Sequence, residues 1–389
     1  MKCKTIFALL IAIEFFSSLS TFAVPVDPRP LKYTQPDGSV ITIRFYGDEV
    51  ISWVETMAGF KLINNGKNGY EYATLSSAGD LQPSGVIAHE ADKRTMKEIG
   101  LLKRASKGVN YSQQQISKIK SSWEASTSGT DSLPHSIGMQ KISKPQRVFS
   151  PSGSKKLLLI LIDFTDRPFN NPLTAHNDFN GLLNTEGYSN NGKAHGSVRD
   201  FFYESSYKNF DLTTTVAGPY HAKYDMAHYG ATGANGAHDT NVKALITEAV
   251  LAANADVNYA EYANEIGEVE GVYVIYAGYG EATSPYLTST IWPHAGSITT
   301  QTLDGVKISK YSCSNELEAG GTDITTIGVI CHEFGHVCGA KDFYDTNYAT
   351  DGQFKGTGYW DVMATGVYNG TPSGSSPAHF NPYVKIQLV

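Results

Sequence analysis

The sequence predicts an α+β fold in which a small antiparallel β module precedes a larger domain of mixed strands and helices. Short strands separated by Gly and Asn turns fill residues 40–75. Further along, two continuous apolar strands at residues 157–164 and 272–277 flank stretches with helical spacing. An apolar helical pattern around residues 324–338 carries two histidines four positions apart. Strands that alternate with helices in this way are typical of a layered domain.

The first residues have the pattern of a secretion signal. Lys2 and Lys4 precede an apolar run, and Thr21-Phe22-Ala23 places small residues where cleavage after Ala23 is expected. The run is too short to remain in a bilayer as a spanning helix, and no later stretch is long and apolar enough. We therefore expect residues 1–23 to be removed, and the mature chain to be secreted or periplasmic with no membrane span.

Composition narrows the choice of partners. The 31 Lys and Arg residues against 38 Asp and Glu residues give a net charge of −7, and charged residues make up only 18% of the chain. The sequence has no basic patch, which argues against a nucleic-acid partner. A length of 389 residues suggests two or three domains.

The N-terminal module is expected to span residues 24–102. Its strands are predicted at residues 40–45, 51–55, 60–63 and 70–75. Residues 103–153 are rich in Ser, Lys and Gln and are interpreted as a linker with one amphipathic helix at 112–125. Exposed polar segments of this kind are preferred sites of proteolytic cleavage.

The larger domain is expected to span residues 154–389. After its opening strand, the pattern predicts a helix in 196–207, a strand at 212–216 and a helix at 241–253.

Three cysteines remain once the signal is removed: Cys313, Cys331 and Cys338. In an oxidising compartment a disulfide is expected. Cys331 and Cys338 would lie about 10 Å apart along one helix, too far to be joined. We predict a Cys313–Cys331 bond, with Cys313–Cys338 as the alternative.

The chemistry is concentrated in His332-Glu333-Phe334-Gly335-His336. Residues four apart lie on one face of a helix, so His332 and His336 can direct two ring nitrogens at one point. Such a pair is typical of zinc ligands, and Glu333 is placed to act as general base on a metal-bound water. Thr322 or Asp323 is the expected cap of this helix.

A catalytic zinc needs a third protein ligand. Gly339 is expected to end the helix in a sharp turn, which would return Asp342 beneath the metal. Asp342 is therefore the favoured third ligand. The other downstream candidates are Asp345, Asp351, Asp361 and His379. No Glu follows Glu333, which argues against a ligand from a later glutamate.

From residue 332 to 345 the chain resembles a metzincin-type metallopeptidase, and more closely the immune inhibitor A (M6) family. That family has H-E-F/Y-G-H-x-x-G-x-x-D followed by x-Y-D, which is similar to His332–Asp342 with Tyr344-Asp345 here. Tyr359–Gly366 resembles the methionine turn of the family. Weaker resemblances lie at residues 157–166, 196–211, 272–281 and 291–294, so the likeness covers about 154–389.

The resemblance implies further roles. Met363 would form the floor beneath the zinc, and Tyr368 is a candidate for a hydrogen bond to the transition state. Residues 24–102 would be a propeptide, released by cleavage between 103 and 155. The family also implies a calcium loop, but residues 262–270 lack its regular aspartates; residues 345–352 are a second candidate for Ca²⁺. His294 is a candidate substrate contact, and a structural role for it is favoured.

These features predict a zinc-dependent endopeptidase with a metzincin-like catalytic domain, acting on proteins or peptides and made as a zymogen. Two alternatives remain. One is a zinc amidase acting on cell-wall peptides. The other is a non-catalytic binding protein that keeps the zinc fold, although Glu333 would have no use there.

Overall fold

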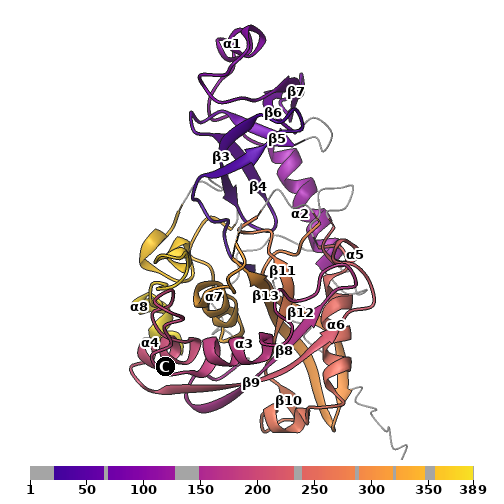
Figure 1. The fold of residues 1–389 in the computed structure, drawn as a ribbon, viewed down its shortest axis with the longest axis vertical. Helices are drawn as coiled ribbons and strands as arrows, with labels where there is room; N and C mark the ends of the chain where they lie inside the picture. Colours follow the sequence, from indigo (N-terminus) through magenta and orange to yellow (C-terminus); the bar gives the residue numbers. More distant parts are fainter. Residues whose placement is uncertain are drawn as a thin grey trace, which may run out of the picture.

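In a computed structural model, the protein consists of two stacked lobes, each built on its own sheet (Figure 1). The structure describes residues 22–64, 69–127, 149–231, 239–284, 289–318, 321–346 and 355–388. The expected α+β organisation is confirmed: an antiparallel sheet comes first and a mixed sheet with helices follows. Nowhere in the described ranges is a helix long and apolar enough to cross a membrane.

The N-terminal sheet has six antiparallel strands in simple sequence order. They are β2 (Leu31–Thr34), β3 (Val40–Gly47), β4 (Ser52–Thr56), β5 (Lys61–Asn64), β6 (Tyr70–Leu75) and β7 (Leu81–Ile87). The four strands expected from the sequence are confirmed. Alternation in β3 places Ile41, Ile43 and Phe45 in the core.

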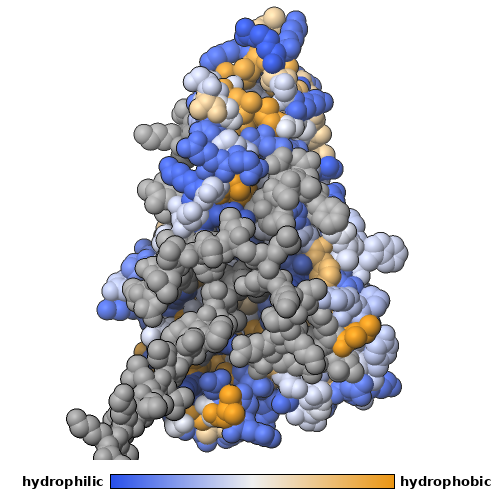
Figure 2. Space-filling view, turned by 180° about the vertical axis from the view of Figure 1, so that it is seen from behind, coloured by the Kyte–Doolittle hydropathy of each residue, from blue (hydrophilic) through white to orange (hydrophobic). Residues whose placement is uncertain are grey.

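Two helices follow this sheet. The first, α1 (Met96–Leu102), begins at a capping box between Thr95 and Glu98. It lies at the far end of the lobe, where apolar atoms reach the surface (Figures 1 and 2). The second, α2 (Gln113–Thr127), confirms the predicted linker helix and runs back toward the other lobe.

His89 joins two acidic residues of this lobe: Nδ1 lies 3.0 Å from Glu98 and Nε2 lies 3.1 Å from Asp37. Burial by itself would lower the pKa of His89, but the two carboxylates raise it. A raised folded-state pKa contributes stability below the unfolded value of about 6.5, and this is lost as pH rises through the folded pKa. His89→Gln should therefore reduce the thermal unfolding temperature more at pH 5.5 than at pH 8.5. An equal loss at both pH values would contradict this.

The second sheet contains five parallel strands and an antiparallel edge. Its order is β1-β12-β13-β11-β8-β9, with the short β10 also beside β13. The strands are β1 (Phe22–Ala23), β8 (Gly153–Asp163), β9 (Phe210–His221), β10 (Glu268–Val269), β11 (Val272–Tyr279), β12 (His294–Leu303) and β13 (Val306–Leu317). Strands β8, β9, β10, β11 and β13 are parallel, and β12 runs antiparallel to β13.

Helices cover both faces of this sheet, and the sequence shows why they must. All six residues 157–162 of β8 are fully buried, a pattern that requires cover on each side. The helices of this lobe are α3 (Ala175–Asn184), α4 (Val198–Ser205), α5 (Met226–Gly230), α6 (Val242–Ala253), α7 (Ile327–Val337) and α8 (Pro382–Leu388), with 3-10 turns η1 (Tyr259–Tyr262), η2 (Gly358–Trp360) and η3 (Thr365–Tyr368). The predicted α4 and α6 are confirmed. Helices α3, α4 and α7 lie on one side and α6 on the other (Figure 1).

Candidate metal centre and cleft

Helix α7 is buried along its whole length, from Ile327 to Val337. It begins after Thr326, so the predicted cap at Thr322 or Asp323 is wrong. The reason lies in pairing at the end of β13. Ile324 forms a bridge with Leu317, and the N–H of Thr325 donates to the carbonyl of Glu316. The backbone before Thr326 is therefore engaged in strand-like contacts and cannot join the helix.

The end of α7 follows the prediction. Gly339 has a φ of +96°, a left-handed conformation that favours glycine. Its N–H donates to the carbonyl of His336, and the N–H of Ala340 donates to that of Gly335. These two bonds form a Schellman motif, which reverses the chain direction. Asp342 is thereby brought back beside the two histidines.

Three ligand atoms meet at one point. His332 Nε2 lies 3.1 Å from His336 Nε2, and Asp342 Oδ1 lies 3.3 Å from the first nitrogen and 3.4 Å from the second. Tetrahedral ligands at about 2.0–2.1 Å from zinc are separated by about 3.3–3.4 Å. Asp342 Oδ1 is buried and has no hydrogen-bond partner among the described residues. The donor set therefore fits a tetrahedral metal ion with one further position.

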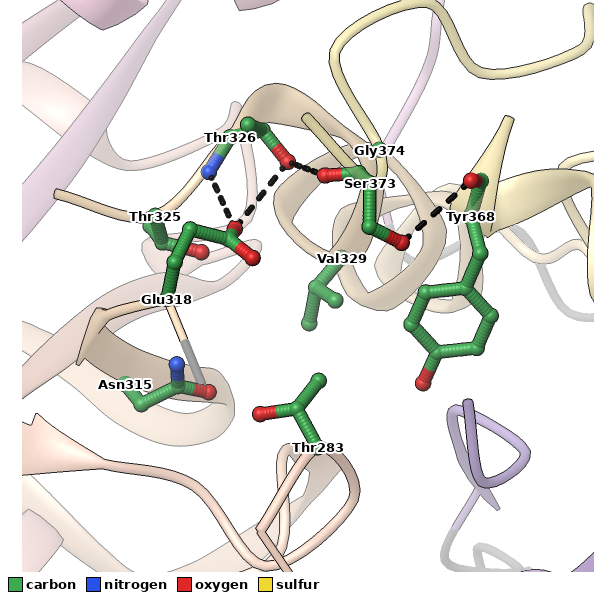
Figure 3. Close-up of a pocket in the computed structure, with 9 residues that line it drawn as sticks. All are labelled: Thr283, Asn315, Glu318, Thr325, Thr326, Val329, Tyr368, Ser373 and Gly374. Carbon is green, nitrogen blue, oxygen red and sulfur yellow. Dashed lines mark hydrogen bonds between the residues drawn. The ribbon is translucent and has the colours of Figure 1, made fainter. Parts of the chain in front are cut away.

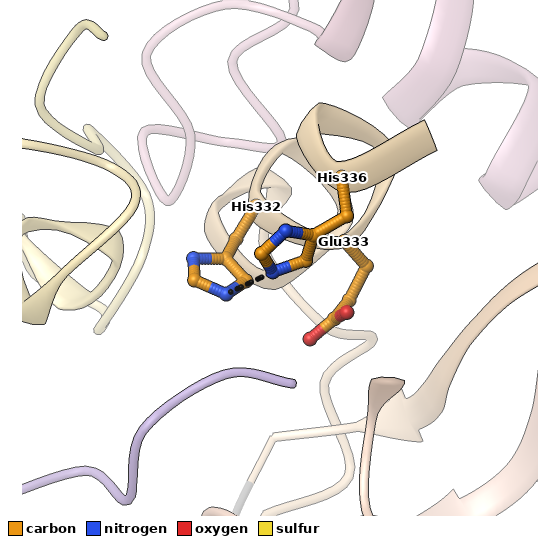
Figure 4. A group of neighbouring side chains, drawn as sticks. All are labelled: His332, Glu333 and His336. Atoms are coloured by element: carbon orange, nitrogen blue, oxygen red, sulfur yellow. Dashed lines mark hydrogen bonds between the residues drawn. The ribbon is translucent and has the colours of Figure 1, made fainter. Parts of the chain in front are cut away.

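Glu333 lies beside the two histidines (Figure 4). Potential ligand atoms of His332, Glu333 and His336 lie within 4.8 Å of one another. Of the two carboxylates, however, Asp342 is the one in contact with both imidazole nitrogens. Burial raises the pKa of Glu333 to about 8, and repulsion from Asp342 adds to this rise. A carboxylate with a pKa near neutrality is suited to exchange protons at neutral pH.

Backbone carbonyls hold the imidazoles in place. His332 Nδ1 lies 2.7 Å from the carbonyl oxygen of Val362, and His336 Nδ1 lies 3.0 Å from that of Ala340. A proton on each Nδ1 makes these hydrogen bonds and leaves Nε2 free to bind a metal. The Val362 contact also connects the metal site to the turn that contains Met363.

Met363 is fully buried beneath α7. A Cβ added at Gly335 would lie 3.0 Å from the Met363 sulfur and 3.0 Å from the Phe380 ring. The N–H of Phe343 donates to the Met363 carbonyl, which ties the turn to the segment that carries Asp342. Gly335, between the two histidines in sequence, thus allows Met363 to pack directly against the helix.

Gly328 makes an even closer approach at the start of α7. An added Cβ would lie 2.1 Å from the Val367 carbonyl oxygen and 2.9 Å from Gly374 Cα, both of which are backbone atoms. Although Ala is the better helix former, overpacking of this kind costs about 1–3 kcal/mol. Gly328→Ala should therefore lower the thermal unfolding temperature. Gly100→Ala in α1, with no atom within 4 Å, is the matched control, and an equal change in both variants would refute the prediction.

The other predicted residues have varied surroundings. His294 is fully buried, with Nδ1 at 2.7 Å from the Trp292 carbonyl and Nε2 at 2.8 Å from the Tyr311 hydroxyl, and burial lowers its pKa to about 4. These are the contacts of a structural histidine.

The two stretches considered for calcium are residues 262–270 and 345–352. In the first, Asn264 organises a tight turn, and no group of three metal-binding side chains forms there. Of residues 345–352, those after 346 lie outside the described ranges.

The predicted Cys313–Cys331 disulfide is not formed. Cys313, Cys331 and Cys338 are buried free thiols. The sulfur of Cys313 lies 3.6 Å from His294 Nδ1 across the β12–β13 pair. Burial raises the pKa of all three thiols.

The N-terminal segment occupies the cleft over the metal centre, a placement that the sequence analysis did not predict. The N–H of Val24 donates to Glu333 Oε1 at 2.8 Å, and the Trp292 indole N–H donates to the Val24 carbonyl at 2.9 Å. The Tyr368 hydroxyl donates to the Pro25 carbonyl. Just before this point, β1 pairs antiparallel with the edge strand β12. These partners lie 268, 309 and 343 positions apart, and no local sequence pattern links residues at such separations.

A small polar pocket lies beside the start of α7 (Figure 3). Its volume of about 10 Å³ has room for about one water molecule. The Thr326 N–H donates to Glu318, and the Thr326 hydroxyl donates to the carbonyl of Ser373. The Ser373 hydroxyl in turn donates to Asp27, which adds an anchor for the N-terminal segment beside this pocket.

A buried helix that directs two imidazoles and a returning carboxylate to one point, below a cleft filled by extended chain, is the arrangement of a metallopeptidase catalytic domain. The comparison with known families gives the same class. The chain belongs to the immune inhibitor A peptidase family, M6, whose catalytic-domain model matches residues 149–388.

Curated relatives are more distant. The chain is 28% identical over 291 residues to the pre-pro-metalloprotease PrtV of Vibrio cholerae serotype O1 (strain M66-2), covering 64% of this chain and 32% of that protein. It is 26% identical over 273 residues to immune inhibitor A of Bacillus thuringiensis subsp. alesti, covering 59% of this chain and 39% of that protein. The matched part thus spans about a third of the length of these relatives.

Proposed function

We propose that this chain is a secreted zinc endopeptidase that is made as a zymogen. The observation that carries the proposal is the triangle of His332 Nε2, His336 Nε2 and Asp342 Oδ1, with sides of 3.1–3.4 Å. Two nitrogens and one oxygen at this spacing suit zinc, and three protein ligands leave the open position that a catalytic site requires. Family membership supports the same class of enzyme.

The side chains around this triangle have distinct roles in the proposal. A zinc ion held here would polarise the scissile carbonyl and lower the pKa of a water molecule. Glu333 takes the proton of that water and later gives it to the leaving amine. Its position supports this role, because the backbone nitrogen of Val24, which becomes the α-amino group of the chain once residues 1–23 are removed, already contacts Oε1. Met363 supports the helix from below, and the Tyr368 hydroxyl donates to a substrate carbonyl as it does to that of Pro25.

The cleft suits extended protein chains. The edge strand β12 pairs with two residues of β1 through main-chain atoms, which are the same in every sequence. The Trp292 indole and the Tyr368 hydroxyl also bind backbone carbonyls. Recognition of this kind favours unfolded or flexible segments of proteins, with side-chain preference added by the pockets.

The same contacts support latency. Val24 and Val26 are buried, and the segment that contains them occupies the cleft where a substrate would bind. Residues 24–102 would be the propeptide, 103–153 the activation segment and 154–389 the catalytic domain. Export would depend on a signal at residues 1–23, of which 1–21 lie outside the described ranges. PrtV is named a pre-pro-metalloprotease, which is in line with this organisation.

The proposal is tested with the chain after cleavage between residues 103 and 155. This form should cut an unfolded protein, lose activity with a chelator and regain it with added zinc. Parallel incubation with cell-wall peptides separates the amidase alternative, because an amidase would cleave these and leave the unfolded protein intact. Stoichiometric zinc with neither substrate cleaved would favour a binding protein.

A further inference from the structure

The small polar pocket at the start of α7 lies beside the extended chain in the cleft (Figure 3). Two of the residues that line it are Thr283 and Ser373. The N–H of Asp27 donates to the carbonyl of Ala282, next to Thr283, at 3.1 Å. The Ser373 hydroxyl donates to the Asp27 carboxylate, also at 3.1 Å. One residue of the N-terminal segment is thus bound on two sides of the pocket, so a substrate on the same path would pass beside it.

The pocket is also close to the proposed base. Val329 lines it and lies four residues before Glu333, one turn away on the same face of α7. Tyr368, whose hydroxyl donates to the Pro25 carbonyl, lines it as well. A side chain near the scissile bond of a substrate would therefore be next to this pocket.

Two side chains of the pocket have polar atoms without a partner. Asn315 and Thr283 are only 3% and 8% exposed, and neither Asn315 Oδ1 nor Thr283 Oγ1 has a hydrogen-bond partner in the described part of the chain. The Asn315 amide nitrogen donates to the Leu317 carbonyl at 2.8 Å, which identifies the other atom of the amide as the oxygen. An amide oxygen only accepts hydrogen bonds, and burying it without a donor is unfavourable. These atoms indicate a ligand that donates hydrogen bonds.

Glu318 adds a negative charge to the same pocket. Oε1 accepts a hydrogen bond of 3.0 Å from the N–H of Thr326, whereas the second carboxylate oxygen has none within the described ranges. Nor does a basic group of those ranges form an ion pair with Glu318, since Arg29 binds Asp27 instead, at 2.6 Å. Burial raises the pKa of Glu318, and the charge of Arg29 offsets only part of this rise. The carboxylate can therefore gain from a further cation.

We propose that the pocket binds the ammonium group of a substrate lysine, with Glu318 as the residue that selects it. This inference rests on the proposed function, because it concerns substrates in the same cleft. Glu318 supplies the charge, while Asn315 Oδ1 and Thr283 Oγ1 accept N–H hydrogen bonds. The pocket volume of about 10 Å³ suits an ammonium group, which is about as large as a water molecule, better than the planar guanidinium of arginine. The enzyme would then cut protein chains at a fixed distance from a lysine.

The test first maps the bonds that the cleaved enzyme cuts in an unfolded protein, by mass spectrometry of the fragments. We expect lysine to be enriched at one fixed position relative to the cut bond. Two peptides are then compared, one with lysine and one with norleucine at that position, because these side chains differ only in the ammonium group. In the parent enzyme, kcat/KM for the lysine peptide should be at least about tenfold higher, as expected for a hydrogen bond to a charged group.

Two variants test the assigned residues. Glu318→Gln keeps an acceptor for the Thr326 N–H but loses the charge, and should lower the lysine-to-norleucine ratio of kcat/KM about tenfold. Thr283→Val removes only an unpartnered hydroxyl and should lower the ratio about threefold. Thr214→Val is the matched control, because Thr214 is also buried with an unpartnered hydroxyl but belongs to β9, at the other end of the sheet from β12. Thermal unfolding establishes that each variant is folded.

The outcomes separate the inference from the proposed function. If the cut bonds show no fixed lysine position, or if either folded pocket variant keeps the parent ratio, the inference is wrong and the proposed function stands. An equal fall of the ratio in Thr214→Val would also contradict it. If the cleaved parent enzyme cuts no protein, the proposed function fails, and the inference fails with it.

Discussion

Glu333→Gln is expected to reduce hydrolysis of an unfolded protein by the cleaved enzyme about 10²–10⁴-fold, the usual contribution of a general acid–base group. The amide keeps the size of the side chain but cannot accept the proton of the attacking water. The burial-raised pKa of Glu333, about 8, shows that its surroundings hold the proton well. That property is useful when the group must return the proton to a leaving amine.

Metal content separates this effect from a damaged site. Glu333 is assigned as a base and not as a ligand, so the Gln variant should retain stoichiometric zinc. Asp342→Ala is the comparison, because loss of the oxygen that contacts both imidazoles should release the metal and the activity together. Undiminished hydrolysis by Glu333→Gln would show that another group is the base.

Removal of the N-terminal domain should raise proteolytic activity at least about 100-fold. A factor of 100 corresponds to about 2.8 kcal/mol. Hydrogen bonds at Val24 and Pro25 contribute about 1 kcal/mol each, and burial of two valines adds about 1.5–3 kcal/mol apiece, enough to exceed this value even after the entropy cost of ordering the segment. The measurement compares the chain that begins at Val24 before and after cleavage within residues 103–155.

Tyr368 provides a graded control for latency. In the uncleaved chain, Tyr368→Phe removes the hydrogen bond to Pro25. The ratio of proteolytic activity before cleavage to that after cleavage should therefore be a few-fold higher in this variant than in the parent chain. The ratio matters because Tyr368 is also assigned a role with the substrate. An uncleaved parent chain that cuts protein as fast as its cleaved form would contradict the zymogen proposal outright.

Local features of the sequence determined much of the candidate site. The spacing of His332 and His336 follows from the helical repeat, and the turn at Gly339 follows from the conformational freedom of glycine. Both depend on residues within a few positions of one another. The strands β3, β8 and β11 were likewise predictable, because their apolar patterns reflect burial on one or both faces.

The tertiary structure decided what depends on distant residues. Because Ile324 is bridged to Leu317, α7 begins only after Thr326, and Cys313 lies beside His294 as a free thiol. Only the folded chain places Val24 against Glu333, 309 positions away, and joins the β3–β4 hairpin to the same segment through the hydrogen bond from the Val26 N–H to the Gly47 carbonyl. Such contacts leave no periodic signal, since they arise from the packing of the two lobes and not from the geometry of one element. The sequence by itself therefore determined the ligand-bearing helix and its turn, whereas only the tertiary structure showed that the protein fills its own cleft.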